Sequence, residues 1–397
     1  MLSAETAAWL SRAKAEVSGL LDLRRAIHGD PELGLDCPRT RAKLERALAG
    51  LPLTFRHSDR CSGFVAVLEG ARPGRTVLLR GDMDALPIHE ATGLDFASKV
   101  AGRMHACGHD THSAMLASAA RLLCGRRDQI TGQILFMFQP GEEGHHGARV
   151  MIEEGLLGNP LPDAAFALHV WPTLPHGAVA CRAGAMLAST DTVMARIVGR
   201  GGHAAMPHEA IDPIPAASEI VLALQAEVAR RNPVHDPIVL SITCINAGSA
   251  HNVLPDAVEM QGTLRALSAE GRERGRAAFD RVCTHVAAAH GCQAEISIVP
   301  GYPPTLNDPR AVALVRTIAG DAFRDLPSPS MGGEDFSYVL RKVPGAMAFL
   351  GVAAVGQESG HCAPLHNPAM IVDEAVLPQG VALHCAFATQ FLDQGWG

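Results

Sequence analysis

The sequence predicts an α/β fold in which a discontinuous domain with a mainly parallel sheet carries an inserted ferredoxin-like α+β module. In the first half of the chain, continuous apolar segments alternate with helical ones. In the middle, the predicted order is strand, helix, strand, strand, helix, strand, and helices with an apolar strand return after it. Strands that are apolar on both faces are typical of parallel sheets. The order in the middle is that of a two-layer ferredoxin-like module.

The first half contains three predicted buried strands with polar residues at their carboxyl ends. They lie at 76–80 in "TVLLRGDMDALP", at 133–138 in "GQILFMFQPGEEG", and in "DAAFALHVWP". A helix is predicted at 113–123. Ligands of parallel sheets bind beyond the carboxyl ends of the strands. The polar residues at these ends are Asp82, Asp84, Glu142, Glu143 and His169.

The inserted module is predicted to span 186–301, so the domain around it comprises 1–185 and 302–397. Its predicted strands are "DTVMARIVGR", "PIVLSITCINAG", "AVEMQGTLRAL" and "QAEISIVPGY". Its predicted helices are "DPIPAASEIVLALQAEVARR" and "SAEGRERGRAAFDRVCTHVAAAHG", the second capped by Ser268 and Gly291. After the module, an apolar strand is predicted at 346–352.

The composition argues against nucleic-acid and membrane partners. The net charge is −7 and only 4% of the residues are aromatic, so neither a basic field nor base-stacking platforms are expected. No segment approaches the ~20 consecutive apolar residues of a membrane span. The N-terminus is predicted to be one amphipathic helix without the features of a signal peptide. The ten cysteines are scattered without a CxxC pair, which favours reduced thiols in the cytoplasm.

The segment "HACGHDTH" at 105–112 indicates a metal site, because clustered Cys and His side chains bind transition metals. Other candidate ligands come from predicted strand ends and loops, and a pair of cations would need about this number. A thiolate can bridge two cations, and a carboxylate beside the water between them can act as general base. The candidate ligands are Cys107, His109, Glu143 and its neighbour Glu142, His169 and His366.

The sequence resembles the hippurate hydrolase and N-acyl-amino-acid amidohydrolase group, which includes plant hydrolases of indoleacetyl-amino-acid conjugates. This group belongs to the co-catalytic metallo-aminoacylase and carboxypeptidase family. The resemblance runs almost end to end and rests on several motifs together. They are "LRRAIHGDPELGLDCPRT", "VLLRGDMDALPI", "MHACGHDTHSAML", "FQPGEEGHHGARVMI", "ALHVWP", "GRGGHAAMPHEAIDPI", "GSAHNVLPDAVEMQGTLR" and "MGGEDFSYV".

The resemblance implies two divalent metal ions per subunit, bridged by Cys107. The terminal ligands would be His109, Glu143, His169 and His366. Glu142 would be general base and acid, and Asp84 would orient His109. Asp82 is interpreted as a turn residue, and His105 and His112 as residues that cap or orient the loop. Zinc suits these ligands, and manganese, cobalt and nickel remain open.

The resemblance also implies that the module is a lid and dimerisation domain. His203 resembles a histidine that reaches into the partner subunit's site and polarises the scissile carbonyl, so a homodimer or dimer-based oligomer is expected. Asn252 and Arg265 resemble substrate contacts, and Arg265 suits a free carboxylate. Gly332 and Gly333 resemble backbone contacts beside the substrate.

The implied activity is hydrolysis of the amide bond of N-acyl amino acids, which are small molecules, to a carboxylic acid and a free amino acid. Benzoyl, acetyl, long-chain acyl and indoleacetyl groups remain open. The alternatives are a metallo-carboxypeptidase or dipeptidase, an N-acetyl-diaminopimelate deacetylase, and a non-catalytic binding protein on the same scaffold. The cysteine of "CGHD" and the histidine of "ALHVWP" favour the hippurate-hydrolase group, since the peptidases usually carry carboxylates there.

Overall fold

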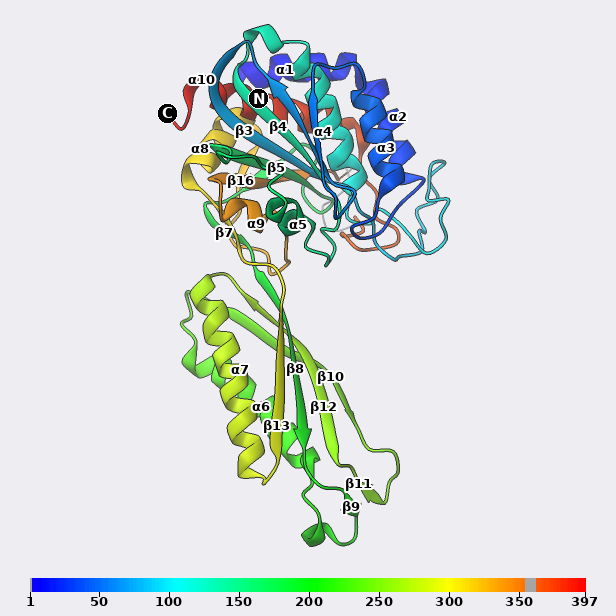
Figure 1. Ribbon diagram of the computed structural model, residues 1–397, viewed down its shortest axis with the longest axis vertical. Helices are drawn as coiled ribbons and strands as arrows, with labels where there is room; N and C mark the ends of the chain where they lie inside the picture. Colours follow the sequence, from blue (N-terminus) through cyan, green and yellow to red (C-terminus); the bar gives the residue numbers. More distant parts are fainter. Residues whose placement is uncertain (1, 354–361) are drawn as a thin grey trace. The chain divides into compact units, whose positions relative to one another are not determined.

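The computed structural model describes residues 2–353 and 362–397, which form two compact units, each with its own sheet (Figure 1). Unit 1 comprises Met1–Gly184, Leu306–Ser328 and Asp335–Gly397. Unit 2 comprises Ala185–Thr305 and Pro329–Glu334. The predicted class, an α/β fold with an inserted α+β module, is confirmed.

Unit 1 is built on a large mixed sheet with strand order β1-β2-β4-β3-β5-β16-β6-β15. The central strands β4, β3, β5 and β16 are parallel neighbours, and β6 pairs in parallel with β15. Antiparallel pairing is confined to β1–β2, β2–β4 and β16–β6. The strands are β1 (Thr54–His57), β2 (Phe64–Glu69), β3 (Arg72–Asp82), β4 (Thr131–Gln139), β5 (Ala164–Trp171), β6 (Val179–Cys181), β15 (Phe323–Asp325) and β16 (Gly345–Gly351).

Helices α4 and α10 pack against β3 and β5 and against each other. Outside them, α1 packs on α10, while α2 and α3 pack on α4. The single N-terminal helix that we predicted is two helices, because the chain leaves helical geometry at Glu16 (φ −108°, ψ 17°). The break lets α1 pack on α10 and α2 pack on α4. The helices of unit 1 are α1 (Ala4–Ala15), α2 (Val17–His28), α3 (Pro38–Leu48), α4 (His109–Cys124), α5 (Gly147–Glu153), α8 (Pro309–Ala319), α9 (Ser337–Leu340) and α10 (Leu377–Gln394).

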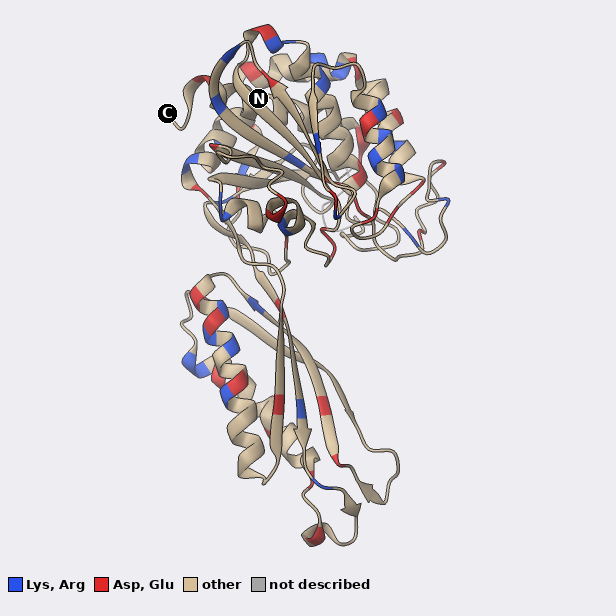
Figure 2. Ribbon diagram, in the orientation of Figure 1, with Lys and Arg blue, Asp and Glu red and all other residues tan. Residues whose placement is uncertain are grey.

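The central strands of unit 1 are largely apolar, whereas its outer helices carry many charged residues. Strands β4, β5 and β16 contain no Lys, Arg, Asp or Glu, whereas α2 and α3 carry many (Figure 2). The stretch Glu374–Gln394, which includes α10, has the length and hydropathy of a membrane span, but 78% of its most apolar window is buried inside the protein. It therefore has the character of a core helix.

Unit 2 is a two-layer module with strand order β10-β12-β8-β13, all antiparallel. This is the ferredoxin-like order expected from the sequence. Helices α6 and α7 pack on the sheet, and β9 pairs with β11 beyond it. The elements of the module and of the segments around it are β7 (Gly184–Leu187), β8 (Ser189–Val198), β9 (Gly202–His203), α6 (Pro213–Arg231), β10 (Ile238–Ala247), β11 (Val253–Leu254), β12 (Ala257–Ala266), α7 (Ala269–Ala289), β13 (Gln293–Pro300) and β14 (Thr305–Asn307).

A buried ionic network fixes the long irregular segment between β3 and α4. His28, at the end of α2, places Nδ1 2.9 Å from Asp110 Oδ2 and Nε2 3.1 Å from Glu90 Oε1. Arg24 Nε donates to the same oxygen of Asp110 at 2.7 Å. Glu90 in turn accepts from the Ser98 N–H at 2.7 Å. The network thus ties the irregular segment to the end of α2 and to the first turn of α4.

The pKa of His28 is raised to about 9. Burial by itself lowers this pKa, but the charge of Asp110 and the hydrogen bonds to Asp110 and Glu90 outweigh it. Both ring nitrogens face a carboxylate, so both donate and the ring is a cation. The pKa of His28 in the unfolded chain lies near 6.5. Its contribution to folding is therefore complete below pH 6.5 and is lost as the pH rises through 9.

We expect His28→Gln to remove about 3 kcal/mol of this pH-dependent stability, the free-energy equivalent of the pKa shift. Urea unfolding of chelator-treated protein at pH 6 and pH 9.5 measures it. The wild type should lose more stability over this interval than His28→Gln does, by about that amount. His57→Gln, which alters an ion pair near the surface, should match the wild type. Equal pH dependence in wild type and His28→Gln would contradict the assignment.

Candidate metal centre

The polar residues predicted at strand ends lie at the carboxyl edge of the parallel strands in unit 1. β3 ends at Asp82, β4 ends just before the segment "PGEEG", and His169 is close to the end of β5. These strands run in parallel, so their ends share one edge of the sheet. The first turn of α4 begins there with His109. Four segments that are distant in sequence therefore contribute to one site.

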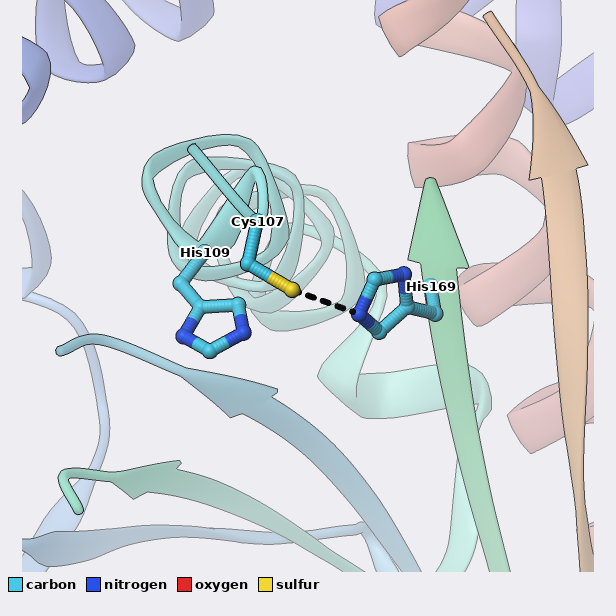
Figure 3. Close-up of side chains that lie close together, drawn as sticks. All are labelled: Cys107, His109 and His169. Carbon is cyan, nitrogen blue, oxygen red and sulfur yellow. Dashed lines mark hydrogen bonds between the residues drawn. The ribbon is translucent and has the colours of Figure 1, made fainter. Parts of the chain in front are cut away.

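The structure brings the five predicted ligands together in two groups that share Cys107. In the first group, the ligand atoms of Cys107, His109 and His169 lie within 4.8 Å of one another. Figure 3 shows the Cys107 sulfur pointing toward the His169 ring, with Sγ 3.4 Å from Nε2. In the second group, Cys107, Glu143 and His366 meet the same limit, and His366 Nε2 lies 3.3 Å from Glu143 Oε1.

Two unusual backbone conformations place these side chains. Gly108 has φ +86°, and a Cβ there would lie 2.3 Å from Val170 Cγ2, so both the conformation and the space require glycine. His366 has φ +63°, which is strained for a residue with a Cβ. Its N–H donates to the Ala106 carbonyl at 2.8 Å, which anchors it beside Cys107.

The donor set fits a divalent transition metal. Thiolate, imidazole and carboxylate are the ligands that such ions prefer. His109 Nε2 is buried without a hydrogen-bond partner among the described residues, and the buried Glu143 Oε1 faces His366 Nε2, another candidate ligand, at 3.3 Å. Buried polar atoms of this kind are costly unless something binds them. Their lone pairs are therefore available to a cation.

The electrostatics also favour positive charge at this place. Hydrogen bonds to Cys107 and Glu143 raise the pKa of His366 to about 10. Burial raises the pKa of Glu143, but the hydrogen bond from His366 and the charge of His109 hold it below its usual value. Burial raises the pKa of the Cys107 thiol, although nearby His109 opposes this. A bound cation would lower the pKa of this thiol by stabilising the thiolate.

Asp84 binds the backbone of the segment that carries the paired glutamates. Its Oδ1 accepts from the Glu142 N–H at 3.0 Å, and its Oδ2 accepts from the Glu143 N–H at 3.1 Å. His109 Nδ1–H donates to the backbone carbonyl of Asp84 at 2.9 Å, while the carboxylate lies 3.5 Å away. Asp84 therefore contacts His109 mainly through its backbone, and its carboxylate positions Glu142 and Glu143.

Glu142 lies beside the two donor groups that share Cys107, and its ligand atom lies within 4.8 Å of those of His109 and Glu143. The residue is only 6% exposed, and its Oε2 lies 4.0 Å from His109 Nε2. Glu143 Oε1 lies at the same distance from that nitrogen. The two neighbouring carboxylates thus approach the cluster from one short segment, which is the geometry that a division of roles between them would need.

The remaining predicted residues lie in unit 2. His203 ends β9 and is exposed, with its Nδ1 accepting from the Ala205 N–H at 3.0 Å. The carbonyl of Asn252 accepts from the Ala204 N–H at 3.1 Å, so these two residues are neighbours. Arg265 is half-buried on β12, and a Cβ on Gly333 would lie 3.6 Å from its Nη1. The exposed Gly332 donates its N–H to Ser330 Oγ at 3.1 Å.

Two residues have larger structural roles than we predicted from the sequence. Asp82 is completely buried, with Oδ2 2.5 Å from Arg80 Nη1 and Oδ1 2.6 Å from His112 Nδ1. His112 Nε2 accepts from the Val170 N–H at 2.9 Å. Asp82, His109 and His112 lie close enough to hold a metal, but Arg80 and Val170 already occupy the atoms it would need.

The sequence and the fold match known proteins. The sequence model of peptidase family M20/M25/M40 matches residues 78–390 of this chain. The chain is 38% identical to an IAA-amino acid hydrolase ILR1-like protein of Arabidopsis thaliana over 94% of this chain and 85% of that protein. It is 37% identical to a thermostable carboxypeptidase of Saccharolobus solfataricus over 94% of this chain and 95% of that protein.

A solved structure from Bacillus subtilis, described as a dinuclear metal-binding peptidase of the M20 family, superposes with a TM-score of 0.83. The two chains are 34% identical, and the match covers 96% of this chain and 99% of that one. The sequence match, the fold and the donor set at the carboxyl edge of the sheet agree. This chain therefore belongs to peptidase family M20/M25/M40.

Proposed function

We propose that this protein is a metal-dependent amidohydrolase that cleaves N-acyl amino acids to a carboxylic acid and a free amino acid. The observation that carries the proposal is the pair of donor groups that share Cys107, in a chain of the M20/M25/M40 family. The Arabidopsis relative, named as a hydrolase of IAA–amino acid conjugates, supports this substrate class.

The proposed centre holds two divalent cations, for which zinc suits the ligands best. Cys107 would be shared by both cations, and His109, Glu143, His169 and His366 would complete the two ligand sets. The dinuclear relative and the shared position of Cys107 in both donor groups support this assignment. When bound, the cations would polarise the scissile carbonyl and lower the pKa of a water molecule.

Glu142 acts as the general base and then as the general acid. Its carboxylate takes a proton from the attacking water and delivers it to the leaving amine, which departs as a neutral amine. Asp84 supports this role, because its carboxylate binds the backbone N–H groups of both glutamates and limits the movement of the segment. Glu143 is kept as a metal ligand in this proposal, because its Oε1 faces another candidate ligand, His366 Nε2, at 3.3 Å.

Unit 2 supplies the substrate contacts in this proposal. The Arg265 guanidinium binds the free carboxylate of the amino acid, with Asn252, Gly332 and Gly333 beside the substrate. Burial lowers the pKa of Arg265, although Asp191 opposes this, so an added carboxylate would compensate a poorly solvated cation. His203 of the partner subunit stabilises the developing oxyanion.

We also propose a division of the chain into two domains. Residues 1–185 and 302–397 form the catalytic domain, and residues 186–301 form a lid and dimerisation domain.

The proposed location is the cytoplasm. All ten cysteines are free in the structure, including the exposed Cys244 and the buried Cys107. Free thiols, one of them a metal ligand, fit a reducing compartment.

Turnover of N-acyl amino acids by metal-loaded protein tests the proposed activity. We expect a metal content near two equivalents, amide hydrolysis of at least one of the benzoyl, acetyl, long-chain acyl and indoleacetyl amino acids, and loss of turnover with a chelator. If the protein removed C-terminal residues from peptides, or cleaved dipeptides, faster than N-acyl amino acids, a peptidase would be favoured. Faster cleavage of N-acetyl-diaminopimelate would favour that deacetylase. Absence of both tightly bound metal and turnover would leave a binding protein.

The two glutamates should respond differently to the same substitution. Glu142→Gln should keep both metal equivalents and lose about 10²–10⁴-fold in kcat, the range for general acid–base catalysis. Glu143→Gln should also weaken metal binding, because an amide oxygen is a poorer ligand than a carboxylate. Metal analysis after dialysis, together with initial rates, distinguishes them. Equal metal loss in both variants would overturn the split assignment.

Mixing two inactive variants tests whether His203 acts across a dimer. In a mixed dimer of His203→Ala and Glu142→Gln, one site combines intact Glu142 with intact His203 of the partner, and the other site carries both defects. An equal mixture with random exchange should recover roughly a quarter of wild-type activity, by counting sites in a symmetric dimer. Subunit exchange is checked by mass spectrometry of differently labelled chains. Exchange without recovered activity would place His203 in its own subunit's site or outside catalysis.

A further inference from the structure

Asp82 and His112 form a completely buried pair beside the proposed metal ligands, and neither residue has a role in the proposed reaction. Asp82 ends β3, and His112 lies in the first turn of α4. Asp82 Oδ1 is 2.6 Å from His112 Nδ1, and the Asp82 carbonyl accepts from the Ser113 hydroxyl. The pair therefore holds the start of α4 against the carboxyl edge of the sheet.

The hydrogen bonds of His112 define its tautomer. The Val170 N–H donates to His112 Nε2 at 2.9 Å, so Nε2 is an acceptor and carries no proton. The proton is on Nδ1, which donates to Asp82. Both ring nitrogens are thus engaged, and the imidazole spans the distance from β3 to β5.

The peptide group that His112 holds is the one that joins His169 to Val170. The Val170 carbonyl accepts from His169 Nδ1–H at 2.7 Å, which leaves the Nε2 lone pair of His169 facing Cys107 Sγ at 3.4 Å. The Val170 side chain fills the space where Gly108 lacks a Cβ. Val170 therefore contacts both sides: its backbone orients the His169 ring, and its side chain packs against the loop that carries Cys107.

Arg80 holds the other side of the pair. Its Nη1 lies 2.5 Å from Asp82 Oδ2, its Nε donates to Gln139 Oε1 at 2.8 Å, and its Nη2 donates to Asp335 Oδ1 at 3.1 Å. Arg80 is 1% exposed, so the Asp82 charge is compensated inside the protein. This anchorage fixes Asp82, and Asp82 fixes the His112 ring.

We propose that His112, anchored by Asp82, is a positioning residue for His169: it binds the peptide N–H of Val170 and so directs His169 Nε2 toward the metal that Cys107 shares. The inference rests on the proposed function, in which His169 is a ligand. Groups that orient metal-binding histidines typically contribute about 10–100-fold to metal affinity. His112 would act on His169 through the backbone, without contacting the metal itself.

Two substitutions separate the two hydrogen bonds of His112. In His112→Asn, the amide is placed like Nδ1, so it keeps the bond to Asp82 and loses the bond to Val170. In His112→Gln, the amide oxygen is placed like Nε2, so it keeps the bond to Val170. We expect His112→Asn to bind zinc about 10–100-fold more weakly than the wild type. His112→Gln should stay closer to the wild type.

Zinc affinity is measured by competition with a chromophoric chelator, and cobalt loading supplies a spectroscopic signature. The thiolate-to-cobalt absorption of His112→Asn should differ from that of the wild type, whereas the absorption of His112→Gln should resemble it. His105→Gln is the matched control, because His105 lies just before α4 and is as buried as His112, and neither of its ring nitrogens has a hydrogen-bond partner among the described residues. It should leave zinc affinity near the wild-type value. Equal weakening in all three variants would mean that only packing matters, which overturns the inference.

His169→Ala distinguishes failure of the inference from failure of the proposed function. Unchanged affinity in His169→Ala would remove His169 from the ligand set and with it the proposed centre. Weaker binding in His169→Ala, together with unchanged binding in His112→Asn, would overturn only the positioning role.

A measurement on the wild type stands even if a variant does not fold. In the zinc-loaded protein labelled with ¹⁵N-histidine, the long-range proton–nitrogen spectrum should show His112 as the neutral Nδ1–H tautomer. A spectrum with the His112 proton on Nε2 would exclude donation from Val170 and overturn the proposal.

Discussion

The ion pair between Arg80 and Asp82 is the interaction on which the carboxyl edge of the large sheet depends. Both side chains are almost completely inaccessible to solvent, and an unpaired buried charge there would cost several kcal/mol. Arg80 also binds Gln139, which ends the neighbouring strand β4, and Asp335. Asp82 binds His112 at the start of α4. One compensated charge thus fixes two strand ends and the helix that carries His109.

The candidate metal centre at this edge combines buried side chains with ligand atoms whose lone pairs face one another. In the interior, a polar atom without a partner is destabilising, and His109 Nε2 is buried without one among the described residues. The hydrogen bonds that do exist engage the other atoms of the ligands: His109 Nδ1 binds the Asp84 carbonyl, and His169 Nδ1 binds the Val170 carbonyl. Each imidazole therefore presents its Nε2 to the centre. Such prior orientation reduces the entropy lost when a cation binds.

The substrate-side residues belong to a unit with a hydrophobic core of its own. That core lies between the sheet and helices α6 and α7, around buried side chains such as Ile197, Leu224 and Phe279. Asp191 on β8 binds Arg272 and Arg276 of α7 and accepts from the Gly301 N–H, so it joins the two ends of the module. Arg265, on β12 of this sheet, therefore belongs to a framework with its own hydrophobic core.

The sequence by itself predicted the layers and the parallel centre of the large sheet, and its resemblance to a known family singled out the five side chains that the structure brings together as candidate ligands. Apolar runs and the residues that end them are local features, and parallel strands bring their ends together without further information. The tertiary structure alone decided how His112 and Asp84 are used, because a hydrogen bond depends on which backbone group lies a few ångströms away. No local pattern in "HDTH" could indicate that His112 meets the amide of Val170. The break of the N-terminal helix at Glu16 has the same origin: α1 and α2 remain locally helical, and their packing on α10 and α4 fixes where the chain turns.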